Sequence, residues 1–224
     1  MKTPDFPPFL RVVALMTAAV LLTLWIRNLI VPERIQDTLL LNLFHGFVPL
    51  VIAWLLQRFN DRISGWFFWL ITLVWVLYYP NSPYMISDLK HVGQSPEAVQ
   101  NYDDLIVFAF AILSAFYGFL SLKIMYRLFR KRRGPRFANL AIWATLLLSC
   151  LGFYMGRVLL LFSADFFKHP LEVIKQVWAH LFPVGDNLST YAIIILFGGV
   201  QWMLLIMMKD VNDIEPNRLV SRSE

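Results

Sequence analysis

The most informative stretch of the chain is residues 105–125, which read LIVFAFAILSAFYGFLSLKIM. Lys123 is its single charged residue. A helix of about 20 apolar residues crosses the hydrocarbon core of a bilayer, because each residue rises about 1.5 Å and the core is about 30 Å thick. The stretch therefore predicts a membrane-spanning helix.

The same character extends over the whole chain. Of its 224 residues, 58% are hydrophobic and 16% are charged, whereas soluble proteins average about 45–50% and about 25%. This composition excludes an ordinary soluble domain and predicts an integral membrane protein. The single cysteine, Cys150, excludes an intramolecular disulfide and every multi-cysteine metal centre.

Five further apolar stretches have a comparable length, so we expect one all-α membrane domain over residues 1–224 with six transmembrane helices. Pro32, Pro80, Pro135 and Pro183 fall between these stretches, where a missing backbone donor does little harm. The segment 209–224 is expected to be a cytoplasmic tail. The predicted spans are 12–30, 39–56, 63–79, 105–125, 137–156 and 191–208.

Between the fifth and sixth spans, residues 170–182 predict a short amphipathic helix. Leu171, Ile174 and Trp178 recur at helical spacing, and polar residues take the other side. We expect this helix to lie at the membrane interface, with a packed loop helix as the alternative.

Lys and Arg are distributed unevenly between the connections. With the N-terminus inside, most of the 20 lie on the inner side, so the positive-inside rule predicts that both termini are cytoplasmic. The position of the largest cluster, in a short hairpin between two spans, favours this topological role and contact with membrane lipid over nucleic-acid binding. The cluster comprises Lys123, Arg127, Arg130, Lys131, Arg132, Arg133 and Arg136.

Small residues form a stripe along the fifth span, and a similar stripe along the fourth includes Ser114, Gly118 and Ser121. Such stripes allow close helix packing in lipid, so we expect the two spans to pack as a hairpin. A homodimer through the stripe of the fifth span is the alternative. That stripe comprises Ala141, Thr145, Ser149, Gly152 and Gly156.

Polar residues gather on the predicted outer side. In the second span, Asn42 and His45 share a helix face with Pro49. After the third span, residues 80–84 read Pro-Asn-Ser-Pro-Tyr. The two prolines predict a stiff turn that ends that span, with Tyr79 and Ser82 outside the helical region.

The turn precedes a second polar face, because Tyr84, Ser87, Asp88 and His91 are spaced as on a resumed helical turn. We expect no metal site and no cofactor, and no catalytic residue can be assigned. For Asp103 and Arg157, helix capping and extension to the interface are alternatives to a ligand role. The candidate ligand-binding residues are Asn42, His45, Asn81, Tyr84, Asp88, His91, Asp103, Arg157 and Asp165.

These residues carry a resemblance to a known family. The chain resembles the bacterial membrane proteins known as domain of unknown function 1361, whose pattern is Pro-Asn-(Ala/Ser)-Pro-Tyr followed by an Asp and a His. The resemblance covers most of residues 40–170 and implies a shared multi-span fold in the bacterial inner (plasma) membrane, without an activity. The matching residues are Pro80, Asn81, Ser82, Pro83, Tyr84, Asp88, His91, Asn42, Leu43, Phe44, Pro49, Tyr102, Asp103, Ser121, Leu122, Gly156 and Arg157.

The chain departs from the family pattern at one place. After Gly156-Arg157 the family has a second Arg and then Trp-Asn-Ser-Trp-Asp, but residues 160–164 read Leu-Leu-Phe-Ser-Ala here. Only Ser163 and Asp165 fit the pattern. If the missing residues belong to a ligand site, this chain binds a different ligand or has lost the site.

Three functions stay open. An accessory or binding subunit, which we favour, would present a polar site on the outer face to a protein partner or a lipid. A membrane enzyme would use Asp88, Asp103 or Asp165 with a histidine on a lipid-linked substrate at the outer leaflet. A small-solute transporter would need a site near the midplane, usually at broken helices. In each, Asp88→Asn and Asp103→Asn are expected to leave folding intact.

Overall fold

The computed structural model describes residues 8–31, 38–93, 95–157, 169–182 and 184–213, and these residues form helices and connections without a strand. They divide into two compact units, Met1–Ser121 and Leu122–Glu224. Helix α5 (Gln100–Arg133) begins in the first unit and ends in the second.

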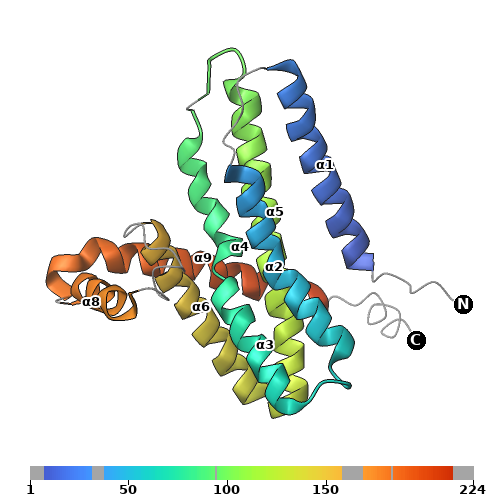
Figure 1. Cartoon of the computed structure of the whole chain (residues 1–224), viewed down its shortest axis with the longest axis vertical. Helices are drawn as coiled ribbons and strands as arrows, with labels where there is room; N and C mark the ends of the chain where they lie inside the picture. Colours follow the sequence, from blue (N-terminus) through green and yellow to red (C-terminus); the bar gives the residue numbers. More distant parts are fainter. Residues whose placement is uncertain (1–7, 32–37, 94, 158–168, 183, 214–224) are drawn as a thin grey trace, which may run out of the picture. The chain divides into compact units, whose positions relative to one another are not determined.

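The first unit is a bundle built around the first part of α5. Helix α1 (Pro8–Ile30) runs antiparallel beside α5 (Figure 1). The hydroxyls of Thr17 and Tyr117 lie 2.6 Å apart, and the Tyr102 hydroxyl donates to the Thr23 carbonyl at 3.2 Å. The hydrophobic effect does not drive helix association in lipid, so hydrogen bonds such as these hold the two helices together. The other elements are α2 (Thr38–Phe59), α3 (Gly65–Tyr78), α4 (Asn81–Tyr84) and the 3₁₀ helix η1 (Met85–His91).

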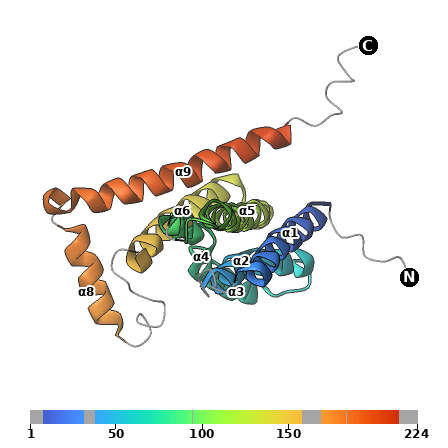
Figure 2. The same ribbon diagram turned by 90° about the horizontal axis from the view of Figure 1, so that it is seen from above.

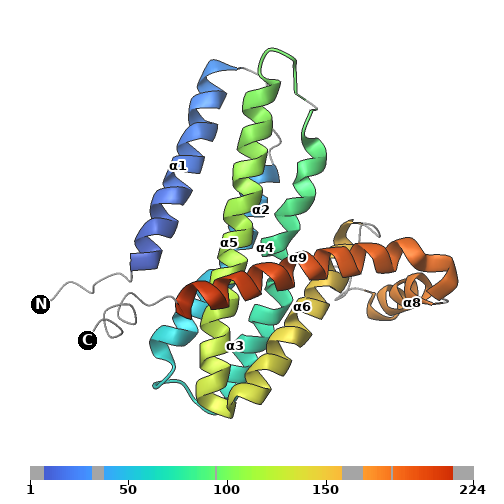
Figure 3. The ribbon, with the colours of Figure 1, turned by 180° about the vertical axis from the view of Figure 1, so that it is seen from behind.

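The second unit contains α6 (Pro135–Arg157), α8 (Pro170–Leu181), η2 (Val184–Asn187) and α9 (Leu188–Asp213). Helix α9 crosses α6, and η2 forms the corner between α8 and α9 (Figures 2 and 3). The rings of Phe153 and Phe197 stack with centroids 4.0 Å apart. The Thr190 hydroxyl donates to the Tyr154 hydroxyl at 2.8 Å. Apolar and polar contacts therefore both hold α9 on α6.

Among the described residues, four helices are long and apolar enough to cross a membrane. They are Leu10–Ile30, Thr38–Phe59, Gln100–Arg133 and Pro135–Gly156. These segments match the first, second, fourth and fifth predicted spans, and they are the helices of a membrane protein. Helix α3 has only 14 residues, and the apolar part of α9 is the shorter segment Thr190–Met203. The count of six spans stays a prediction.

Helix α8 coincides with the amphipathic helix predicted at residues 170–182. Val173 is buried, whereas Leu171, Ile174 and Trp178 are 72%, 53% and 64% exposed. An apolar helix face open to the surroundings suits a membrane interface. The interfacial position itself stays a prediction.

Helix α3 ends at Tyr78, just before the Pro-Asn-Ser-Pro-Tyr stretch, but the backbone stays helical beyond it. Tyr79 has φ −53° and ψ −40°, and Ser82 lies in α4, so the prediction that these two residues lie outside the helical region is wrong. Pro80, with φ −56°, precedes the first turn of α4, where a proline ring fits without losing a bond that the helix needs. Helices α3, α4 and η1 therefore form one broken helix from residue 65 to residue 91.

Candidate functional site

Ser82, in the break of this helix, is clamped between α2 and α5. Its hydroxyl donates to the Gly46 carbonyl at 2.6 Å, and the Ser114 hydroxyl donates to the Ser82 carbonyl at 2.8 Å. Ser82 and Ser114 are fully buried. Serine hydroxyls thus satisfy backbone groups around the break, as a membrane interior requires.

The clamp depends on two glycines. A methyl group at Gly118 would come within 2.8 Å of the Ser82 Cβ, and one at Gly46 would collide with the Ser114 hydroxyl. Trp75 Nε1 donates to the Ser121 hydroxyl at 3.4 Å. The small residues of the fourth predicted span were expected to face the fifth span, and their contacts here are with α2, α3 and α4.

The contacts also fix the depth of the break within the first unit. Ser114 and Gly118 lie near the middle of the 34-residue helix α5, and Ser82 packs against both. The Pro-Asn-Ser-Pro-Tyr stretch therefore follows the end of α3, as predicted, and lies beside the middle of α5.

Two of the candidate residues, Asn42 on α2 and Asp88 on η1, form a hydrogen bond with each other. The Asn42 amide donates to the Asp88 carboxylate at 2.9 Å, which joins the start of α2 to η1. Asp88 is 5% exposed and Asn42 is half-buried. Carboxylates buried within a helical bundle mark functional sites in membrane proteins.

The other candidates have separate positions. Asn81 and Tyr84 are half-buried in α4, and the Asn81 amide donates to the Tyr78 carbonyl at 2.9 Å. His45 is half-buried in α2, with its ring 5.8 Å from that of Phe44. The side chains of His91 and Arg157, and Asp165 as a whole, lie outside the described residues.

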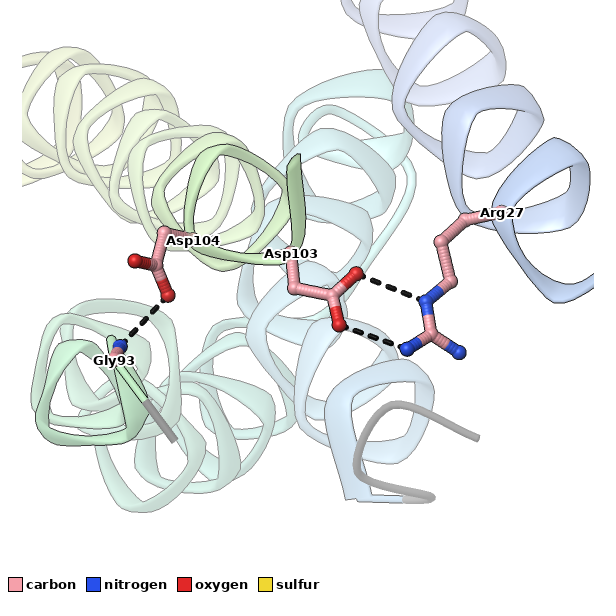
Figure 4. A network of polar contacts seen from close by, with 4 residues as sticks. All are labelled: Arg27, Gly93, Asp103 and Asp104. Atoms are coloured by element: carbon pink, nitrogen blue, oxygen red, sulfur yellow. Dashed lines mark hydrogen bonds and ion pairs between the residues drawn. The ribbon is translucent and has the colours of Figure 1, made fainter. Parts of the chain in front are cut away.

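Asp103 forms a buried ion pair with Arg27. Nε and one terminal nitrogen of Arg27 donate to the two carboxylate oxygens at 2.9 and 2.8 Å, and both side chains are 2% exposed (Figure 4). Two parallel hydrogen bonds give such a pair its directionality. The pair ties the end of α1 to the start of α5, a role that neither capping nor extension to the interface predicts.

The neighbouring carboxylate points to the other side of α5. Asp104 accepts a hydrogen bond of 2.8 Å from the backbone N–H of Gly93, which has φ +82° (Figure 4). Glycine suits this left-handed conformation. Adjacent acidic residues therefore hold α1 and the segment after η1 separately.

The described residues contain no group of three or more His, Cys, Asp or Glu side chains that could hold a metal ion. The polar groups that the structure brings together suit hydrogen bonding and charge recognition.

The comparison with known families agrees with these features. The profile described as "Protein of unknown function (DUF1361)" matches residues 41–204. The chain belongs to this family. No curated protein and no solved structure matches the chain.

Two residues that carry the DUF1361 resemblance contact each other, because the Asn42 amide donates to the Asp88 carboxylate. A third, Ser121, accepts a hydrogen bond from the indole of Trp75, which is not part of the resemblance. The departure from the DUF1361 pattern at residues 160–164 lies outside the described residues.

Two residues of this polar network were not among the candidates. Arg27 ends the first predicted span, on the same predicted side as Asp103, and this position was a usable signal for pairing. Ser82 was part of the motif but not a candidate, because a serine between two prolines is typical of a turn.

Proposed function

We propose that the protein is a binding subunit of the bacterial inner membrane, with both termini in the cytoplasm and a polar site around Asn42 and Asp88 on the outer side. The observation that carries this proposal is the Asp88 carboxylate, buried at the broken helix and oriented by the Asn42 amide. Groups held in place before binding lose little entropy when a partner arrives.

The surrounding contacts support a rigid platform. Ser82 is clamped on α2 and α5, and the buried pair of Arg27 and Asp103 fixes α1. These groups hold the helices, which leaves Asp88 as the buried carboxylate without an arginine partner among the described side chains. We therefore assign recognition to Asp88 and architecture to Asp103.

Photocrosslinking in cells tests the proposal. A photoreactive residue at Leu41 or Val92, which are exposed beside the site, should yield a discrete adduct with a second protein. Asp88→Asn should weaken that adduct severalfold, whereas Asp104→Asn should leave it unchanged. The matched control is Trp66, 71% exposed at the opposite end of α3. The same adducts from Trp66, or adducts indifferent to Asp88→Asn, would contradict the proposal.

A solute transporter is the second candidate, because the broken helix lies beside the middle of α5. Transporters place substrate and ion sites at discontinuous helices near the bilayer midplane. In proteoliposomes, a transporter should give charge movement after a sodium or pH jump. Asp88→Asn should abolish that signal, and Asp104→Asn should preserve it. Absence of any signal from protein that still crosslinks would favour the binding subunit.

A further inference from the structure

The connection between α5 and α6 is a tight basic hairpin, which we define as residues 127–136. Helix α5 ends at Arg133 and α6 begins at Pro135, so Gly134, with φ +87°, is the whole connection. Its N–H donates to the Arg130 carbonyl at 3.0 Å, and its carbonyl accepts from the N–H of Ala138 at 3.1 Å. The turn is therefore a fixed continuation of both helices.

The basic hairpin is strongly cationic. No acidic residue occurs from position 105 to position 164. Five of its basic side chains are exposed, and one, Arg132, is half-buried. Arginine predominates, and its planar guanidinium binds phosphate through two hydrogen bonds. The exposed basic residues are Arg127, Arg130, Lys131, Arg133 and Arg136.

The helix lengths place these charges at the membrane surface. Both α5 and α6 are long and apolar enough to span. If residues 105–125 fill the hydrocarbon core, residues 126–133 extend about 12 Å beyond it at 1.5 Å per residue. The headgroup layer on each side is about 5–8 Å thick, so the basic hairpin passes through the level of the lipid phosphates.

We propose that the basic hairpin binds the phosphate groups of anionic phospholipids in the leaflet on its side of the membrane. Charge complementarity selects the anionic headgroup, and the one-residue turn holds the guanidinium groups together at phosphate depth. This site is separate from the Asn42–Asp88 pair, and it does not depend on the function proposed for that pair.

Native mass spectrometry of the full-length protein tests this site. The protein is extracted from bicelles containing equal amounts of phosphatidylglycerol and phosphatidylcholine, and retained lipids are counted. Wild-type protein should retain phosphatidylglycerol in several-fold excess. Each basic side chain near an anionic surface changes binding by about fivefold, so R130Q/R133Q/R136Q should reduce the ratio to about that of the bicelle.

Two matched variants test the alternative explanations. One tests whether the loss follows from the number of charges removed, and the other tests whether it follows from misfolding. R11Q/R58Q/R62Q removes three exposed arginines elsewhere and should keep the enrichment. R130K/R133K/R136K keeps the charge and should retain most of it. Inorganic phosphate at millimolar concentration should not displace the lipid; full displacement would identify a free-phosphate site instead. Unchanged enrichment in R130Q/R133Q/R136Q, or an equal loss in R11Q/R58Q/R62Q, would overturn the proposal.

Discussion

The Ser82 hydroxyl, on α4, donates a 2.6 Å hydrogen bond to the carbonyl of Gly46 on α2. The Ser82 carbonyl in turn accepts from Ser114 on α5. One small residue in the broken helix thus connects three elements of the first unit. This arrangement requires that the facing positions have no side chain, which is why Gly46 and Gly118 lie there.

Gly118→Ala should destabilise the first unit by about 1–3 kcal/mol, the usual cost of overpacking. The new methyl group would come within 2.8 Å of the Ser82 Cβ, which is attached to the backbone and moves only with α4. Thermal unfolding in detergent micelles measures the effect. Gly65→Ala is the control, because a Cβ there meets nothing within 4 Å; equal midpoints for the two variants would refute the clamp.

Arg27→Gln and Asp103→Asn should each lower the free energy of unfolding by about 3–5 kcal/mol, because each leaves the other charge buried without its counter-ion. Both side chains of the ion pair are 2% exposed. We therefore no longer expect Asp103→Asn to leave folding intact. A denaturant titration in mixed micelles measures the loss.

The double variant R27M/D103L tests whether Arg27 and Asp103 affect the free energy of unfolding as a pair or independently. Removing both charges should cost much less than the sum of the single changes, since no buried charge remains unpaired. Asp104→Asn is the matched control, because that carboxylate accepts a hydrogen bond from the Gly93 N–H and is less buried. Additive losses in the double variant would show that Arg27 and Asp103 act independently.

The all-helical membrane fold could be predicted from the sequence, because apolar stretches long enough to cross a bilayer indicate membrane-spanning helices. Four of the predicted spans coincide with long apolar helices. Asn42 and Asp88, two of the candidate residues, form a hydrogen bond, while their place on the outer side stays a prediction. Helix α3 ends where the prolines predict, but the residues before Pro80 and Pro83 are helical because each proline lies at or near the start of the short helix α4.

Pair partners were harder to predict than helices. Sequence periodicity shows which residues share a face of one helix, but it does not show which helix faces it. The spacing of Ser114, Gly118 and Ser121 therefore predicts a packing surface, but it does not predict their contacts with α2, α3 and α4. Arg27 and Asp103 are 76 positions apart, and only the fold brings them together.

The Asn42–Asp88 pair predicts an asymmetry between two substitutions. Asn42→Ala leaves the buried Asp88 without its amide donor and should cost about 1–3 kcal/mol. Asp88→Asn keeps an oxygen that can accept the hydrogen bond, so stability should change by less than about 1 kcal/mol while the proposed partner is lost. Unfolding midpoints, measured beside the crosslinking yield, check both; a greater loss of stability in Asp88→Asn would contradict this account.

Cys150, the single thiol of the chain, provides a probe for the contact between α6 and α9. It is 2% exposed, and Gln201 donates to its sulfur at 3.8 Å. A Cβ at Gly198 would approach that sulfur to 3.1 Å, whereas a Cβ at Gly199 meets nothing within 4 Å. Gly198→Leu should therefore separate the helices and speed the reaction of Cys150 with a maleimide at least about tenfold, by loss of packing in the interface. Gly199→Leu should react at the wild-type rate, and rapid labelling of the wild-type thiol under native conditions would show that α9 does not cover it.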